Sequence, residues 1–309
     1  MTGIWGLIRQ REWAAAGYLT GWKVVSALPR PVAQTLFTFG ADLASDHGRG
    51  MDQLRRNLTR VVGAENVTSE LVRDSVRSYA RYWMEAFRLP SLVADPDLLR
   101  RITDGVVGRD IFEASLARGK GVILVLPHTG NWDMAGMWLS SNYGQFATVA
   151  ERVKPEALFN AFVDYRESLG FEVLALTGHS EPPFARLREV LYDGGVVCLL
   201  GERDLRQTGV EVEFFGEHTT MPAGPVKLAQ ETGAGLHVVH GWFPSEDGWG
   251  FSVSDELEVT DLESTTQRMA DLFAANIAAH PVDWHMLQPQ WTSDINEAKA
   301  RRAARREAT

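Results

Sequence analysis

Residues 121–133 read Gly121-Val122-Ile123-Leu124-Val125-Leu126-Pro127-His128-Thr129-Gly130-Asn131-Trp132-Asp133. The apolar run before the proline predicts a buried strand, and the polar residues after it predict a turn into a helix. His128 and Asp133 would then lie outside the carboxyl end of a strand, where open α/β sheets hold reactive groups. Because a carboxylate raises the basicity of a nearby imidazole, this pair could deprotonate an alcohol near pH 7. A buried histidine that only ends the strand is the alternative.

Short β-branched runs alternate with helical segments from residue 121 onward. This alternation predicts an α/β fold with a largely parallel central sheet flanked by helices on both faces. We expect strands over Val122–Leu126, Ala147–Ala150, Glu172–Leu176, Val196–Leu200, Glu211–Phe215, Leu236–Trp242 and Phe251–Val253. We expect helices over Ile111–Ala117, Asn131–Ser140, Glu156–Leu169, Pro183–Tyr192, Pro222–Thr232 and Thr265–Ala279. Pro222, preceded by Thr219 and Thr220, has the pattern of a helix start.

The first hundred residues are predicted to form an N-terminal helical extension. Prolines at positions 29 and 31 end a first helix, and later helices are expected over Val32–Leu43, Arg49–Val61 and Ser69–Leu89. The last of these carries an aromatic stripe, which is more typical of core than of a binding site. We therefore divide the chain into a helical region, 1–100, and an α/β core, 101–309, within what we expect to be one continuous domain.

The net charge of −9 is spread unevenly over the 309 residues. Residues 1–40 carry +3 and residues 299–309 carry +4, so the remainder carries −16. An acidic body with basic ends argues against nucleic acid as a partner and favours contact with an anionic membrane surface. The Arg-rich C-terminal helix is either a second electrostatic contact or only a solvated tail. The single cysteine, Cys198, lies in an apolar run, which predicts a buried side chain and a reducing, cytosolic setting.

Residues 4–28 mix tryptophans at positions 5, 13 and 22 with basic residues. This composition suits an amphipathic helix lying on a membrane surface, and a helix packed on its own protein is an equal alternative. The sequence shows neither an apolar stretch of about 18 residues nor the pattern of a signal peptide. We therefore expect the region 1–100 to be associated with a membrane surface without spanning it.

Several common catalytic patterns are missing from the sequence. It has no HExxH or CxxC pattern, no GxGxxG after a strand and no Walker loop, so we expect neither a metal site nor a bound cofactor. Gly178-His179-Ser180 lacks the closing glycine of a nucleophile elbow. Polar residues instead follow three expected strands, namely His128 and Asp133, then Glu151, Arg152 and Lys154, and finally Glu202, Arg203 and Asp204. Because the carboxyl ends of parallel strands share one edge, these groups can converge.

The spacing from His128 to Asp133 is similar to the His-x4-Asp motif of glycerolipid-type acyltransferases, and the chain from there to about Ala234 resembles the bacterial lipid A biosynthesis acyltransferase family. Supporting residues are Lys154-Pro155, Arg166, Glu202-x-Asp204, Phe214-Phe215-Gly216, Thr219, Thr220, Gly224, His280-Pro281, Trp284 and Trp291. Lipid A enzymes usually have an N-terminal membrane span, and an Asp at the position of Glu202. The likeness is therefore to the phosphatidylinositol mannoside branch of the family.

The resemblance implies transfer of a long-chain acyl group from acyl-CoA, as co-substrate, to a mannose hydroxyl of a mannosylated phosphoinositide at the cytoplasmic face of the plasma membrane. His128 would be the general base, and backbone N–H groups at the start of the helix after Asn131 would hold the oxyanion. Either Glu202 or Asp133 could orient the imidazole. We favour Glu202, with Asp133 held in a salt link to Arg166.

Substrate-binding residues are expected among the polar groups at the sheet edge, because guanidinium and ammonium groups suit the phosphates of CoA or of an inositol lipid. They are Glu151, Arg152, Lys154, Arg166, Arg203 and Asp204. An acyl-chain pocket is expected at Trp132, Met134, Gly136, Met137 and Trp138, with ordinary helix packing as the alternative. Acyl transfer to a lipid A-type or lysophospholipid acceptor, acyl-CoA hydrolysis, and non-catalytic lipid binding stay open as other functions.

Overall fold

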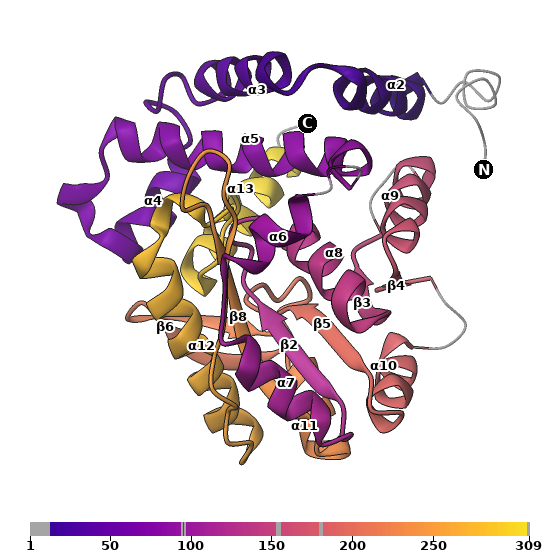
Figure 1. Cartoon of the computed structure of the whole chain (residues 1–309). Coiled ribbons are helices and arrows are strands. Elements are labelled where there is room, and N and C mark those ends of the chain that lie inside the picture. The colour runs from indigo at the N-terminus through magenta and orange to yellow at the C-terminus, as the bar shows by residue number, and fades with distance from the viewer. Residues whose placement is uncertain (1–12, 94, 96, 153–155, 179–181, 308–309) are drawn as a thin grey trace.

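A computed structural model describes residues 13–93, 95, 97–152, 156–178 and 182–307. Figure 1 shows a central sheet enclosed by helices, with further helices from the N-terminal region lying over one end. The fold is mixed α/β, as the alternation of patterns predicts.

Within the described residues, a seven-stranded sheet has the order β1-β9-β8-β2-β5-β3-β4. Its strands are β1 Val106–Val107, β2 Val122–Leu126, β3 Phe146–Ala150, β4 Phe171–Ala175, β5 Val196–Leu200, β8 Gly235–Trp242 and β9 Gly250–Val253. Neighbouring strands are parallel except β8 and β9, so the prediction of a largely parallel sheet is confirmed. Strand β2 lies directly beside β5, with Leu126 opposite Leu200. The carboxyl ends of these two strands therefore meet.

Helices cover both faces of the sheet because successive residues of a strand point to opposite sides. Leu124 and Leu126 pack on the face covered by the helices from α5 to α9, whereas Ile123 and Val125 pack on the face covered by α10, α11 and α12. The first set comprises α5 Ser69–Leu92, α6 Leu98–Thr103, α7 Arg109–Ala117, α8 Trp132–Tyr143 and α9 Glu156–Ser168. The second comprises α10 Pro183–Tyr192, α11 Gly224–Thr232 and α12 Leu262–Ala279. Two short 3-10 turns, η1 Ala64–Asn66 and η2 Pro281–Asp283, complete the connections.

The strand expected over 211–215 forms but does not join the main sheet. As β6, Val210–Phe214, it pairs antiparallel with β7, Glu217–Met221, in a separate hairpin. The turn contains Phe215 and Gly216, both with positive φ, and tight hairpin turns require such a backbone. The helix start expected at Pro222 is accordingly wrong, because Thr219 and Thr220 are strand residues and α11 begins at Gly224.

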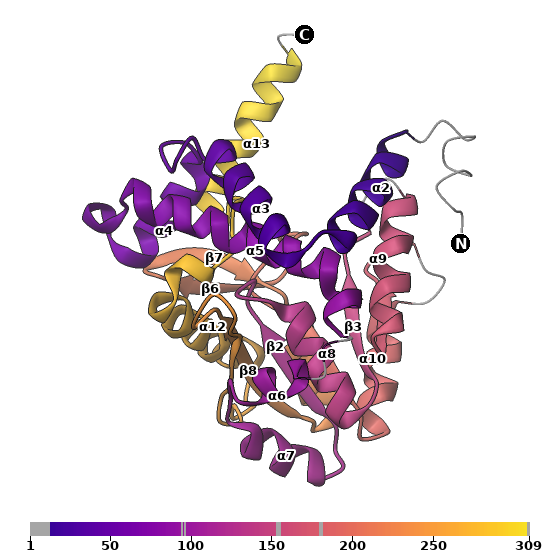
Figure 2. The same ribbon diagram turned by 45° about the horizontal axis from the view of Figure 1, so that its top comes forward.

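Three further N-terminal helices precede α5. They are α2 Trp13–Ala27, α3 Arg30–Ala44 and α4 Asp52–Val62, and Figures 1 and 2 show α2 and α3 lying across α5. Trp22 packs against Phe87 of α5 and Phe162 of α9, with ring centroids 5.4 and 5.1 Å apart. Trp22 is thus packed on its own protein, one of the two alternatives for this helix, while residues 4–12 and the side chain of Trp13 lie outside the described part. Among the helices that the structure describes, none is long and apolar enough to cross a membrane.

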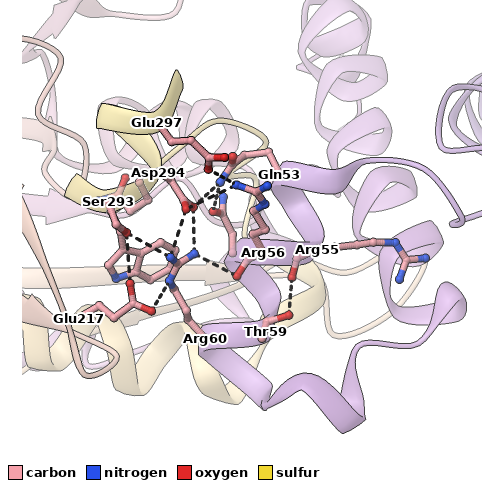
Figure 3. Close-up of polar contacts among 12 residues, drawn as sticks. Gln53, Arg55, Arg56, Thr59, Arg60, Glu217, Ser293, Asp294 and Glu297 are labelled. Atoms are coloured by element: carbon pink, nitrogen blue, oxygen red, sulfur yellow. Dashed lines mark hydrogen bonds and ion pairs between the residues drawn. The ribbon is translucent and has the colours of Figure 1, made fainter. Parts of the chain in front are cut away.

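The C-terminal helix α13, Thr292–Glu307, is fastened to α4 and β7 by a charged network (Figure 3). Arg60 of α4 binds Asp294 at 2.9 Å and Glu217 at 2.8 Å, and its guanidinium lies 4.5 Å from the ring centre of Trp291. Arg60 and Asp294 are both largely buried. This network fixes the beginning of α13, from which the rest of the helix projects away from the body (Figure 2).

Candidate active site

The histidine after β2 is bound by a carboxylate from the neighbouring strand. The Nδ1 atom of His128 lies 2.8 and 2.9 Å from the two carboxylate oxygens of Glu202, which follows β5. The backbone N–H of His128 also donates to Glu202, at 2.6 Å. A carboxylate offers only acceptors here, so Nδ1 carries the hydrogen and Nε2 presents a free lone pair. Glu202 is fully buried, whereas the ring of His128 is partly exposed, as a base that meets a substrate must be.

Two glycines allow this close approach. A Cβ atom at Gly201 would lie 2.2 Å from a methyl carbon of Val125, so only glycine lets the chain pass β2 and deliver Glu202. Gly130 has a φ of +58°, and a Cβ there would lie 2.6–2.7 Å from the backbone of Gly241 and Trp242. The turn after His128 thus packs tightly against the backbone of β8, and this packing requires glycine at position 130.

Asp133 is engaged elsewhere. Its oxygens accept hydrogen bonds from Arg166 at 2.7 and 3.1 Å and from the hydroxyl of Tyr82 at 3.0 Å. Burial and the charge of Asp133 raise the pKa of Tyr82. Burial opposes the charge on Arg166, yet the Asp133 carboxylate raises the pKa of that guanidinium. The structure therefore places Asp133 in a buried ion pair with Arg166 and not against His128.

The first turn of α8 is held rigidly beside His128. The side chain of Asn131 accepts from the N–H of Met134 at 3.0 Å and donates to the buried Glu85 at 2.7 Å. Glu85 also accepts from Trp249 at 2.8 Å. Since the first backbone N–H groups of a helix have no intrahelical partner, those after Asn131 can hold a negative oxygen.

A cavity of about 370 Å³ lies between the sheet and α8 and reaches His128. This volume is within the usual range of small-molecule sites, roughly 300–1,000 Å³. The ring of Trp132 stands at its mouth, 5.5 Å from the His128 ring and 3.9 Å from that of Tyr82. Apolar side chains on the sheet and α8 supply most of the lining, among them Leu124, Leu126, Phe146, Leu139, Ala150, Phe171, Cys198 and Leu200. The cavity is therefore shaped to take an apolar group beside a histidine base.

The expected pocket residues divide between this cavity and the core. Trp132, Gly136 and Trp138 line the cavity. Met134 and Met137 do not, because they point into the hydrophobic cluster beneath α8 and are buried there. At Gly136, a Cβ would lie 2.5 Å from the Phe171 ring. Its lack of a side chain makes room for that ring.

The polar residues of the sheet edge are only partly brought together. Glu151, Arg166 and Arg203 line the cavity, and Arg203 donates to Gln288, another lining residue. Lys154 lies outside the described residues.

Arg152 and Asp204 are not among the cavity-lining residues. Arg152 binds Glu156 at 2.5 Å on the surface. Asp204 accepts from the N–H of Gly209 at 2.7 Å and from Thr220 at 3.0 Å, and so fixes the loop before the β6–β7 hairpin. Both side chains thus have partners within the protein, and a substrate contact for either of them stays a prediction.

Sequence reasoning did not find a second histidine at the cavity, His285. Its Nε2 lies 3.0 Å from the hydroxyl of Ser78, and that hydroxyl donates to Asp283 at 2.6 Å. The carboxylate thus contacts the hydroxyl and not the ring, which is the wrong order for a nucleophilic triad. Burial, with a contribution from His128, lowers the pKa of His285 to about 3, so the ring stays neutral.

The aromatic stripe of α5 also contributes to the cavity, through Tyr79, Tyr82 and Trp83. Helical spacing predicts Tyr79 and Trp83 as core and does not single out Tyr82. Spacing alone cannot distinguish a core contact from a cavity wall. His285 and Gln288 have no local sequence pattern that could have identified them.

The sequence is similar to those of known proteins. The family model described as bacterial lipid A biosynthesis acyltransferase matches residues 5–293. The chain is 54% identical over 290 residues to the phosphatidylinositol mannoside acyltransferase of Mycolicibacterium smegmatis, which covers 93% of this chain and 94% of that protein. It is 53% identical over 292 residues to the phosphatidylinositol mannoside acyltransferase of Mycobacterium tuberculosis, covering 93% of this chain and 90% of the relative.

Proposed function

Because this chain belongs to the bacterial lipid A biosynthesis acyltransferase family and is an acyltransferase, we propose that it moves a long-chain fatty acyl group from acyl-CoA to a mannose hydroxyl of a phosphatidylinositol mannoside. The observation that carries this proposal is the His128–Glu202 contact at the mouth of an apolar cavity. The names of the two relatives support the acceptor. Acyl-CoA acts as co-substrate, and no bound cofactor takes part.

The residues at the cavity mouth can carry out each proton transfer. The sugar hydroxyl oxygen attacks the thioester carbonyl carbon while the Nε2 atom of His128 takes the hydroxyl proton. The resulting imidazolium is stabilised by Glu202, and backbone N–H groups after Asn131 stabilise the oxyanion. When the C–S bond breaks, His128 returns the proton to the departing thiolate. General acid–base catalysis of this kind contributes about 10²–10⁴-fold in rate.

The cavity and its rim offer the binding interactions that this reaction needs. An acyl chain in the cavity gains roughly 0.8 kcal/mol for each buried CH₂ group. Arg203 and Glu151 line the cavity at the carboxyl ends of β5 and β3, the edge of the sheet that carries His128. A guanidinium there suits a phosphate, and a carboxylate can accept hydrogen bonds from sugar hydroxyls. Trp132 beside His128 limits the access of water, which would hydrolyse the thioester.

Labelled substrate distinguishes this function from the others. We would incubate the purified protein with radiolabelled palmitoyl-CoA, with and without a phosphatidylinositol mannoside. Label in the glycolipid only when acceptor is present supports the proposal, and loss of that transfer in the His128→Ala variant supports the base. Free fatty acid in both tubes would indicate a thioesterase. Faster transfer to a lysophospholipid or to a lipid A-type precursor would indicate an acyltransferase for that acceptor. No reaction at all would indicate lipid binding alone.

We further propose that the enzyme works at the cytoplasmic face of the plasma membrane as a peripheral protein. Exposed apolar residues recur along α3 at intervals of three and four, which places them on one side of the helix. They are Val32, Leu36, Phe39 and Leu43. Figure 2 shows α2, α3 and the projecting helix α13 on one side of the molecule, and α13 carries Lys299, Arg301 and Arg305. An apolar stripe with nearby cations suits an anionic lipid surface.

Vesicle flotation tests this surface. The parent should float with phosphatidylcholine vesicles that contain phosphatidylinositol and less with phosphatidylcholine alone. Phe39→Asp should lower the bound fraction several-fold, because a carboxylate cannot enter the interface. Val107→Asp is the matched control, since Val107 is similarly exposed but lies on β1. Equal flotation of all three proteins would overturn the proposal for α3.

A further inference from the structure

The cavity wall carries a charged group, remote from His128, that the proposed reaction does not use. Arg109 of α7 is among its lining residues. The Nε–H of Arg109 lies 2.8 Å from the hydroxyl oxygen of Tyr143 and 2.9 Å from a carboxylate oxygen of Glu113. The Tyr143 hydroxyl donates to the same carboxylate oxygen at 2.7 Å. We call Arg109, Glu113 and Tyr143 the terminal cluster.

The length of helix α8 gives the distance between the terminal cluster and the catalytic base, His128. The helix begins beside His128 and leads to β3, which runs parallel to β5, so its later residues lie towards the opposite end of the sheet. Trp132, Gly136 and Leu139 line the cavity on successive turns. A rise of about 1.5 Å per residue places Leu139 about 10 Å and Tyr143 about 16 Å beyond Trp132. The terminal cluster therefore lies at the end of the cavity remote from His128.

Aromatic packing ties the cluster to the cavity wall. The ring of Phe112, a lining residue, meets the ring of Tyr143 edge-on at 5.0 Å, and Trp138 meets it at 5.6 Å. Away from the polar residues near His128, the cavity wall is apolar as far as these rings, and it carries charged groups beyond them. Hydrogen bonds from Tyr143 and Arg109 lower the pKa of the Glu113 carboxyl, which keeps this end charged.

The change from apolar to charged wall has a direct consequence for an acyl chain. Each CH₂ group buried between Trp132 and Phe112 improves binding by roughly fourfold. A chain that reaches further leaves the apolar wall and meets the side chains of Arg109 and Glu113, which are charged and nearly half exposed to water. Its additional CH₂ groups therefore gain little from burial. We propose that the terminal cluster sets the upper limit of acyl-chain length for the donor. This inference rests on the proposed function, because it assumes that the cavity holds the acyl group.

The test is a competition among donors of different length. The full-length protein receives an equimolar mixture of saturated acyl-CoAs from twelve to twenty carbons together with the phosphatidylinositol mannoside acceptor, and products are counted by mass spectrometry. Arg109→Leu removes the charge and extends the apolar wall, so the ratio of eighteen- and twenty-carbon products to sixteen-carbon product should rise about threefold or more. Leu139→Phe narrows the cavity two turns in and should shift the distribution to shorter chains.

A matched control lies directly after the same helix. Arg118, just after α7, is as exposed as Arg109 and also pairs with a glutamate, Glu256, but it is not a lining residue. Arg118→Leu should leave the product distribution unchanged. An unchanged distribution in a folded, active Arg109→Leu enzyme would overturn the inference, as would the same shift in Arg118→Leu.

A binding measurement separates this inference from the proposed reaction. Unlabelled fatty acids of each length displace a fluorescent palmitate analogue, and this needs no turnover. Displacement that favours longer chains in Arg109→Leu, and shorter ones in Leu139→Phe, supports the terminal cluster even if the parent fails to transfer acyl groups from acyl-CoA. If the parent transfers acyl groups but neither assay shows such a shift, the proposed reaction is supported and the role of the terminal cluster in limiting chain length is excluded.

Discussion

Both carboxylate oxygens of Glu202 lie within 2.9 Å of the Nδ1 atom of His128, while the carboxylate of Asp133 lies 2.7 Å from Arg166. One acid therefore orients the base, and the other neutralises a buried cation. The His-x4-Asp motif is therefore recognised in the sequence without its two residues being in contact. The carboxylate that binds the histidine belongs to a residue 74 positions away.

This division predicts different defects for the two amide variants. Glu202→Gln should lower kcat by about 10²-fold or more, because the amide cannot stabilise the imidazolium, and should change the thermal midpoint little. Asp133→Asn should lower the free energy of unfolding by roughly 3–5 kcal/mol, because it leaves Arg166 buried without its charge partner. Steady-state kinetics and urea unfolding measure the two quantities. A full loss of kcat in Asp133→Asn, at unchanged stability and with Glu202→Gln active, would contradict the assignment.

Two buried histidines predict a loss of stability in acid. Burial, with small contributions from His280 and His128, lowers the pKa values of His240 and His285 to about 3, whereas histidine in an unfolded chain titrates near 6.5. Between these values the unfolded state binds protons that the folded state does not. Stability is thus complete above about pH 6.5 and falls as the pH falls towards 3.

Thermal unfolding at about pH 7 and pH 5 measures this effect. His240→Phe should reduce the dependence on pH, because phenylalanine fills the site without titrating. His218→Phe, at an exposed position, should keep the dependence of the parent. The same slope in all three proteins would exclude His240 as a source of acid sensitivity.

Gly136 and Gly40 form a matched pair of helix-interior glycines. A Cβ at Gly136 would lie 2.5 Å from Phe171 and 3.0 Å from Phe146, whereas a Cβ at Gly40 meets nothing within 4 Å. Gly136→Ala should destabilise the protein by about 1–3 kcal/mol through overpacking. Gly40→Ala should stabilise it by about 0.5–1 kcal/mol, since alanine is the better helix former. Chemical unfolding provides both values, and a change of the same sign at both sites would contradict the packing at Gly136.

The charged network of Figure 3 predicts which residues hold α13 against α4. Arg60→Ala should cost roughly 3–5 kcal/mol because Asp294 would stay largely buried without its partner. Arg56→Ala should have a much smaller effect, because its ion pair with Glu297 is exposed to solvent. Urea unfolding and limited proteolysis of residues 292–307 would report the difference. Equal effects of the two substitutions would show that Arg60 has no special part in holding the helix.

The local sequence determined most of the secondary structure and the position of the base. The apolar run Val122–Leu126 forms β2 as predicted, and Asn131 caps the helix that follows it. These features depend on hydrophobic periodicity and on capping, which act between residues close in sequence. The same reasoning misplaced the start of α11 and did not foresee that β6 would leave the main sheet, because strand pairing is not a local property.

The tertiary structure alone decided which side chains meet. Strand order brings Glu202 to His128, and helix orientation turns Met134 and Met137 into the core. Packing of α5 against the segment that holds Asp283 and His285 places Ser78 beside both of them. None of these contacts has a signal in nearby sequence. The physical reason is that each depends on the relative position of elements far apart in the chain, which is fixed only when their apolar faces are buried together.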